Sequence, residues 1–354
     1  MYFCSETAAI MYRLYCRALA WPQGRLNLGS AMLSAICFVV ILFTVSYTKS
    51  LMLQIYSLMC IFHCMSLLLD LLVAALNSDH GRRMIVNGKN TDSNNTSYGY
   101  ERADVVGLFS ITMLVQLGAL FVVKESFEQL LESHHDGSPL VSNFWLVLAP
   151  SLAFFTQLYI IYAVPSASLT HVITASSSSW LQEQAADFSH ALCRVLPVFS
   201  AFLLPRINTV LLISLSGWTL CICNYICIEA YNYTKCDAAF CLLYATMLIG
   251  TMYPLAVYTG GILLQSCPSY MLPQLEKCLR ECGTLDGVLE VTDEHFWQLS
   301  FNKMAGSLLV RVRRDADEQL VLARVCAKLH PFVSNLTVQV VKDTAWKAQQ
   351  HQLH

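Results

Sequence analysis

The chain has 354 residues, of which 55% are hydrophobic and 13% are charged, and its mean hydropathy is +0.49. This composition is more apolar than a soluble domain can hide in one core, so it excludes an ordinary soluble protein and indicates a membrane protein. The formal net charge is −2, and the absence of a basic cluster in the sequence gives no sign of a nucleic-acid partner.

Six apolar stretches are long enough to cross a bilayer, which takes roughly 20 uncharged residues. Five contain no charged residue, and the second contains one acid, Asp70. The six stretches are Leu26–Tyr47, Leu51–Leu76, Val105–Val123, Leu140–Val164, Ile207–Ile228 and Ala238–Leu264. The first is too long and too far from Met1 for a signal peptide, so we expect it to be retained as a span.

Basic residues predict the orientation of these spans. They precede the first span and separate the second from the third, so both segments should be cytosolic. The residues are Arg13, Arg17 and Arg25, then Arg82, Arg83, Lys89 and Arg102. The loop after the third span is mostly acidic and fits the lumenal side.

A seventh apolar segment, Phe188–Leu204, complicates the count. The fourth span returns the chain to the cytosol, so residues 176–264 must cross an even number of times if the C-terminal region is also cytosolic. We therefore expect six transmembrane helices and one extra apolar segment. The preferred exception is Ile207–Ile228, as a re-entrant segment or a continuation of the preceding helix past Pro205.

After Pro268 the pattern becomes that of a soluble domain. Helical periodicity over 268–282 is followed by alternating patterns over 287–300 and 305–315, a helix over 316–329 and a last strand over 332–341. This order predicts a cytosolic α+β ferredoxin-like domain. The expected organisation is a cytosolic segment 1–25, a transmembrane domain 26–264, the ferredoxin-like domain 265–343 and a tail 344–354.

Ionisable side chains at membrane depth cost roughly 2.5–3.5 kcal/mol each, so they often mark an ion pathway. His63 lies in the second span, and Glu183 and Asp187 are four residues apart and so share one helix face. One imidazole with two carboxylates is a plausible zinc-binding set. Asp70 cannot join it, because seven residues correspond to about 10.5 Å of helix rise. Leu67, one turn from His63, has no donor atom.

Simpler interpretations of these residues stay open. His63 could be a core histidine that is hydrogen-bonded to a neighbouring helix, and the two acids could lie on a solvated helix start. Most of the fifteen cysteines lie in apolar runs, and no CxxC occurs, which favours small core residues over metal ligands or disulfides. A cysteine-rich redox or sensor module without transport activity is an alternative function.

Several long stretches resemble the cation diffusion facilitator family. They include "SYGYERADVVGLFSITMLVQLGALFVVKESFEQLLE" (97–132), "SSWLQEQAADFSHALC" (178–193), "GTMYPLAVYTGGILLQSCP" (250–268) and "GTLDGVLEVTDEHFWQLS" (283–300). The resemblance implies six spans, both termini cytosolic, a dimer, and export of cytosolic zinc in exchange for protons. It implies a transporter and not an enzyme, with zinc as the transported ion and no certain cofactor.

The resemblance also implies a site and shows where this sequence departs from it. Active family members carry His-x-x-x-Asp on the second and fifth spans, and the matching pairs here are His63 with Leu67 and Glu183 with Asp187. One ligand is lost and one is replaced. In the C-terminal domain, His295 matches a family histidine that can lie near a cytosolic zinc site.

These departures imply an auxiliary subunit with a degenerate site of its own. Its partner would be a zinc transporter 5-like subunit, in a heterodimer of the Golgi apparatus and early secretory pathway. The alternative within transport is an autonomous zinc transporter that uses His63, Glu183 and Asp187 with a bound water.

Overall fold

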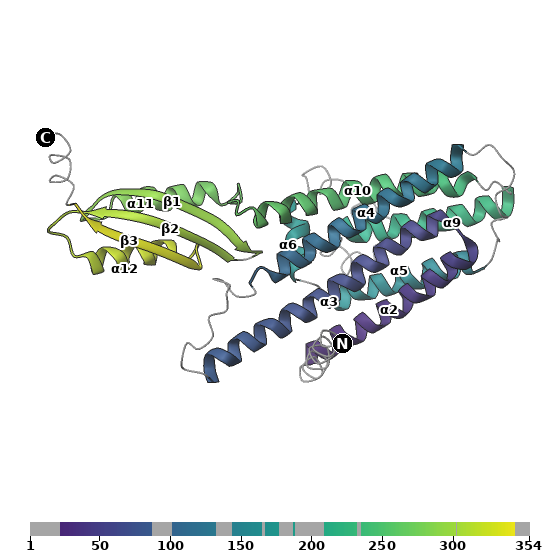
Figure 1. Cartoon of the computed structure of the whole chain (residues 1–354), viewed down its shortest axis with the longest axis horizontal. Coiled ribbons are helices and arrows are strands. Elements are labelled where there is room, and N and C mark those ends of the chain that lie inside the picture. The colour runs from purple at the N-terminus through teal and green to yellow at the C-terminus, as the bar shows by residue number, and fades with distance from the viewer. Residues whose placement is uncertain are drawn as a thin grey trace, which may run out of the picture. The chain divides into compact units, whose positions relative to one another are not determined.

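A computed structural model describes residues 22–86, 101–131, 144–164, 167–176, 187, 209–231, 235–301 and 303–343. The chain divides into two compact units, Met1–Thr259 and Gly260–His354. The first holds the membrane helices and the second holds the sheet with its two covering helices (Figure 1). The domain boundary expected at 264/265 stays a prediction.

The described part of the first unit is helical throughout its regular structure (Figure 1). Its elements are α2 (Pro22–Thr48), α3 (Leu51–Val86), α4 (Ala103–Leu131), α5 (Trp145–Ala163), α6 (Ala167–Ser176), α9 (Thr209–Tyr231) and α10 (Lys235–Leu263). All but α6 are long and apolar enough to cross a membrane, which makes six candidate spans among the described residues. The predicted fold class, a membrane bundle with a small α+β domain, is confirmed.

The outward faces of these helices are apolar, as lipid contact requires. In the most apolar window of each span, only 33–39% of residues are buried inside the bundle. Large side chains such as Phe43, Phe121 and Tyr253 are 75%, 64% and 63% exposed to the surroundings. A helix that is apolar on all sides suits a bundle surrounded by hydrocarbon.

One alternative for the predicted topology is wrong. Helix α9 runs without interruption for 23 residues, about 34 Å at 1.5 Å per residue, so residues 209–228 are not re-entrant. The other alternative, that this segment continues the preceding helix past Pro205, involves residues outside the described ranges. Helix α9 is the fifth span-length helix, in chain order, among the described residues. Apolar length alone could not choose between neighbouring segments of similar hydropathy. The rival segment, 188–204, lies outside the described residues.

Helix α3 is at the centre of the bundle. It packs against α2, α4, α5 and α9, and its first two turns contain side chains with no exposed surface, among them Met52, Ile55 and Tyr56. A helix buried on several sides has its depth and rotation fixed by its neighbours. The positions of other helices relative to His63 can therefore be described by their contacts with α3.

The second unit is a mixed three-stranded sheet with two helices. Its elements are α11 (Leu272–Gly283), β1 (Val288–Ser300), β2 (Lys303–Val312), α12 (Glu318–Leu329) and β3 (Asn335–Lys342). The strand order is β1-β2-β3. Strands β1 and β2 are antiparallel, whereas β3 is parallel to β2, because the α12 crossover returns the chain to the same end of the sheet. This is the helix, strand, strand, helix, strand order that the sequence predicts.

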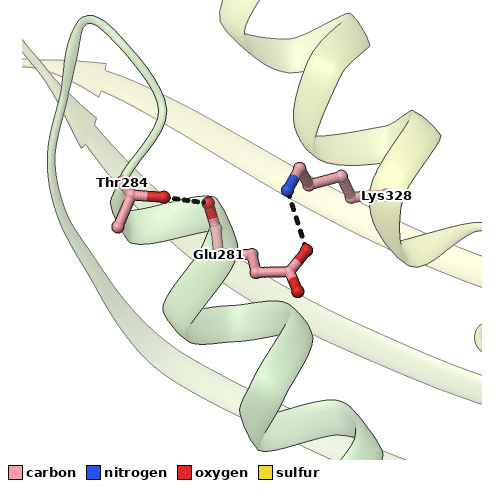
Figure 2. A network of polar contacts seen from close by, with 3 residues as sticks. All are labelled: Glu281, Thr284 and Lys328. Atoms are coloured by element: carbon pink, nitrogen blue, oxygen red, sulfur yellow. Dashed lines mark hydrogen bonds and ion pairs between the residues drawn. The ribbon is translucent and has the colours of Figure 1, made fainter.

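The apolar sides of both helices cover one face of the sheet. Cys282 of α11 and Val321, Val325 and Leu329 of α12 form one buried cluster with Leu308, Val310 and Val312 of β2. An ion pair joins the helices at the surface, where Lys328 Nζ lies 2.9 Å from Glu281 Oε2 (Figure 2). The Thr284 hydroxyl donates to the Glu281 carbonyl at 2.9 Å and closes the end of α11.

Candidate ion site in the helix bundle

His63 is a buried imidazole in the middle of α3, with 3% of its surface exposed. Its Nδ1 lies 2.8 Å from the Met59 carbonyl oxygen. Because a carbonyl only accepts, Nδ1 carries the proton and Nε2 presents a lone pair. No hydrogen-bond partner for this buried Nε2 occurs among the described residues. A neutral imidazole with an open lone pair is the form in which histidine binds a metal ion or takes up a proton.

The position one turn further along α3 is closed by apolar packing. Leu67 is 2% exposed and belongs to a buried cluster with Ala31 of α2, Ile160 of α5 and Val164, which directly follows α5. A leucine side chain has no donor atom, and its neighbours are aliphatic. The partner of His63 that the family resemblance implies on this helix is therefore absent.

Contacts between α3 and α9 fix which residues of α9 lie beside His63. A Cβ added to Gly217 would lie 2.6 Å from Tyr56 Cδ2, so α9 passes close to α3 there. Asn224, later in α9, shares the Asp237 carboxylate with the Leu51 amide at the start of α3. The two helices are therefore antiparallel.

Because the helices are antiparallel, equal steps in opposite sequence directions from the Gly217–Tyr56 contact reach the same level. Two turns, or seven residues, correspond to about 10.5 Å at 1.5 Å per residue. Seven residues back from Gly217 is Val210, and seven residues on from Tyr56 is His63. Val210 thus lies at the level of His63, and Ser214 lies one turn from Val210 on the same face. Both are buried, at 4% and 0% exposed.

Val210 and Ser214 are therefore the residues that α9 places at the level of His63. Val210 has no donor atom, and the Ser214 hydroxyl donates to the Val210 carbonyl at 3.0 Å. Helix α9 contains no His or Asp, and its one acid, Glu229, lies in its last turn. The sequence analysis did not single out Val210 or Ser214, because neither is a His, Cys, Asp or Glu. The apolar run that begins at Thr209 is the sequence signal that would have pointed to these two positions, because both lie in its first two turns.

The other predicted ligands are not brought to His63 by the described residues. Asp187 is helical and exposed, whereas Glu183 lies outside the described ranges. No group of three or more His, Cys, Asp or Glu side chains that could hold a metal ion occurs in the part of the chain that the structure describes. The set of His63, Glu183 and Asp187 stays a prediction.

A buried carboxylate at the end of the bundle was not singled out from the sequence. Asp237 opens α10 and has no exposed surface. It accepts hydrogen bonds of 2.6 Å from the Ser50 hydroxyl, the Leu51 amide and the Asn224 side chain. The first amides of a helix have no partners within the helix, and a carboxylate there also stabilises the positive end of the helix dipole. Asp237 therefore caps α3 and joins it to α9 and α10.

A second polar contact lies along α3 between this cap and His63. Gln157 of α5 is 2% exposed. Its amide donates to Cys60 Sγ at 3.2 Å, and its carbonyl oxygen accepts from the Tyr56 hydroxyl at 3.4 Å. These bonds tie α5 to the same side of α3 and stop one turn before His63.

In the C-terminal domain, His295 lies exposed on β1, opposite Ser307 of β2. It lines a cleft of about 630 Å³ that also includes Cys267, Glu276, Glu294 and Trp297. Leu309 of β2 pairs with Thr292 of β1. The family resemblance would place a second histidine at position 309, and this chain has leucine there. The predicted cytosolic site at His295 stays a prediction.

Two cysteines of this domain, Cys267 and Cys282, have surroundings that disfavour the thiolate. Burial raises the pKa of the Cys267 thiol above its ordinary value. Burial also raises the pKa of Cys282, against a smaller lowering by the charge of Lys328. A redox or sensor module needs thiols of lowered pKa, so these two cysteines do not favour that function.

Similarity to known proteins agrees with this architecture. A model of the cation efflux transmembrane domain matches residues 28–264. Zinc transporter 6 of Danio rerio is 43% identical over 314 residues, which cover 88% of this chain and 61% of that protein. Zinc transporter 6 of Homo sapiens is 47% identical over 250 residues, which cover 70% of this chain and 52% of that protein. The chain thus spans between half and two thirds of the length of these relatives. With six span-length helices and a matching domain over most of its length, the chain belongs to the cation diffusion facilitator family.

Proposed function

We propose that this chain is the auxiliary subunit of a heterodimeric zinc/proton antiporter that moves cytosolic zinc into the Golgi apparatus and early secretory pathway. The partner is a zinc transporter 5-like subunit with a complete site, and both termini of this chain are cytosolic. The similarity to proteins named zinc transporter 6 supports zinc as the substrate. The auxiliary role depends on the site itself.

The observation that carries the auxiliary role is that no set of three or more metal-binding side chains forms around His63 among the described residues. Four positions define the level of the site, and three of them hold Leu67, Val210 and Ser214. Zinc in proteins takes Cys, His, Asp or Glu ligands, and a catalytic or open site still needs three of them. One imidazole supplies too few donors to compete with water for a divalent cation.

The buried polar side chains of Asp237 and Gln157, which join the helices around this site, have hydrogen-bond partners. The Asp237 carboxylate holds α3, α9 and α10 together through short hydrogen bonds, and Gln157 ties α5 to α3. A bundle of this kind can support a partner subunit without binding the ion. This combination of intact packing and missing ligands is what an assembly subunit requires.

Zinc uptake into vesicles tests the proposal. Vesicles would contain this chain alone, the zinc transporter 5-like subunit alone, or both, under an imposed pH gradient. We expect no uptake with this chain alone and more uptake with the pair than with the partner alone. His63→Ala in this chain should leave uptake by the pair unchanged. Uptake by this chain alone at the rate of the pair would contradict the proposal, as would failure of the two chains to purify together.

A second candidate function has one observation in its favour. The His63 Nε2 is buried and has no hydrogen-bond partner among the described residues, as a metal ligand would be in the absence of its ion. An autonomous transporter would complete this ligand with Glu183, Asp187 and a water. It would move zinc when reconstituted alone, and Asp187→Ala would abolish that uptake, whereas Asp187→Ala would not affect an auxiliary subunit.

A further inference from the structure

Two cysteines at one end of the bundle differ from the others in the membrane unit. Cys227 lies in the last turns of α9 and Cys236 is the second residue of α10. Both thiols are partly exposed, and their side chains are hydrogen-bonded to each other. Cys221 and Cys241, deeper in the same two helices, are buried. Reagents can therefore reach the outer pair more easily than Cys221 and Cys241.

A buried polar contact holds this pair in place. Asn224 lies three residues before Cys227, and Asp237 follows Cys236 directly. The Asn224 side chain donates to the Asp237 carboxylate at 2.6 Å. Because this bond fixes α9 against α10 beside the thiols, their proximity follows from the packing of the two helices. Thiols already in hydrogen-bond contact need only a small side-chain rotation to reach bonding distance.

We propose that Cys227 and Cys236 form a disulfide that closes the α9–α10 hairpin. The pair lies at the end of the bundle that holds the α2–α3 turn, because Asp237 bonds Ser50 and Leu51 there. With a cytosolic N-terminus, this end faces the lumen. The choice of compartment rests on the proposed function, and the lumen of the secretory pathway favours disulfides.

The reaction is thiol–disulfide exchange with a small-molecule disulfide such as oxidised glutathione. One cysteine thiolate attacks the glutathione disulfide, forms a mixed disulfide and releases one glutathione thiol. The second thiolate attacks the cysteine sulfur of the mixed disulfide and releases the other. Two cysteine thiols are oxidised and one glutathione disulfide is reduced to two thiols. The bond would restrain a short loop of the unfolded chain.

Peptide mapping of the full chain tests the bond. Protein purified in detergent would be equilibrated with oxidised or reduced glutathione, alkylated, digested and analysed by mass spectrometry. We expect a peptide that joins Cys227 to Cys236 after oxidation and its loss after reduction with dithiothreitol. Cys236→Ser should abolish the cross-linked peptide. Cys223→Ser is the matched control, because Cys223 is exposed on α9 one turn before Cys227, and it should leave the cross-link intact.

Two outcomes would overturn the proposal. One is separate alkylation of Cys227 and Cys236 in the oxidised wild-type protein, and the other is a cross-link from either residue to a different cysteine. The wild-type comparison with and without dithiothreitol remains decisive if the Cys236→Ser variant does not fold. The assay reads thiols and not zinc, so its result is independent of whether the chain assists zinc transport. Alkylation in intact secretory membranes before purification should also give the cross-link, and its absence there would contradict the assigned compartment and the proposal.

Discussion

The first turn of α3 and the turn that holds His63 differ in how their buried polar groups are hydrogen-bonded. At the first turn, the Asp237 carboxylate takes donors from Ser50, Leu51 and Asn224. At the middle of α3, His63 Nε2 has no partner among the described residues, and the nearest positions are aliphatic or already bonded. Polar groups buried without partners are costly. The difference teaches that the polar groups needed for packing are satisfied, whereas those needed to hold an ion are missing.

The largest expected effect comes from adding ligands at the middle of α3. The double variant V210H/S214D would place an imidazole and a carboxylate on α9 at the level of His63. Three protein ligands and a water suffice for zinc, so the variant should retain stoichiometric zinc after dialysis, as measured by elemental analysis, whereas the wild-type chain should not. Adding His63→Ala to the double variant should remove the zinc. Equal zinc content in the wild-type chain would contradict the derived register.

Removing the cap should cause the next largest loss. Asp237→Ala removes the acceptor of four buried donors, each of which costs about 1–3 kcal/mol when left without a partner. We therefore expect a clear fall in the thermal stability of the purified chain in detergent. Asp237→Asn keeps the shape and part of the hydrogen bonding and should fall less. If both variants were as stable as the wild-type chain, the cap would not be what joins α3, α9 and α10.

The close approach of α9 to α3 predicts a smaller effect at Gly217. A Cβ there would lie 2.6 Å from a Tyr56 ring carbon and 2.8 Å from a Tyr244 ring carbon. Gly217→Ala should therefore destabilise the bundle by about 1–3 kcal/mol, as overpacking does. Gly250→Ala is the control, since no heavy atom lies within 4 Å of its added Cβ. A melting temperature that fell equally in both variants would remove the register argument.

The smallest effect is expected at the surface of the C-terminal domain. The Lys328 side chain lowers the pKa of Glu281 by hydrogen bonding and by its charge, and Glu281 raises the pKa of Lys328. The stabilisation is therefore complete above the ordinary glutamate pKa of about 4.3 and below the ordinary lysine pKa of about 10.4. It is lost as pH falls through the lowered Glu281 value or rises through the raised Lys328 value.

Hydrogen exchange of α11 in the full chain would measure this contribution. Glu281→Gln should slightly speed the exchange of α11 amides at neutral pH and should slow none of them. The effect is small because exposed ion pairs contribute little to stability. The difference from the wild-type chain should vanish in acid, because Glu281 of the wild-type chain is then protonated in both the folded and the unfolded state. A large or pH-independent difference would mean that the variant had disturbed the packing of α11 instead.

Sequence reasoning predicted much of the fold, whereas the residues of α9 at the level of His63 came only from the structure. The helix, strand, strand, helix, strand order after Pro268 followed from periodicity, since each element of that domain has one buried side. The re-entrant alternative for residues 207–228 was wrong, because apolar length cannot separate a re-entrant segment from a span. The family resemblance placed the fifth-span ligands at Glu183 and Asp187, and that assignment stays a prediction. Val210 and Ser214 do not stand out, and only the contacts of Gly217 and Asn224 reveal their level.

The sequence by itself determined the membrane class, the family and the loss of the second-span ligand at Leu67, because these depend on composition and on residues adjacent in the chain. Only the tertiary structure decided which residues of α9 lie beside His63, and that Asp237 caps a helix that begins 186 residues earlier. Such pairings depend on the depth and rotation of packed helices. These are set by close contacts between distant residues, which a hydropathy pattern does not encode.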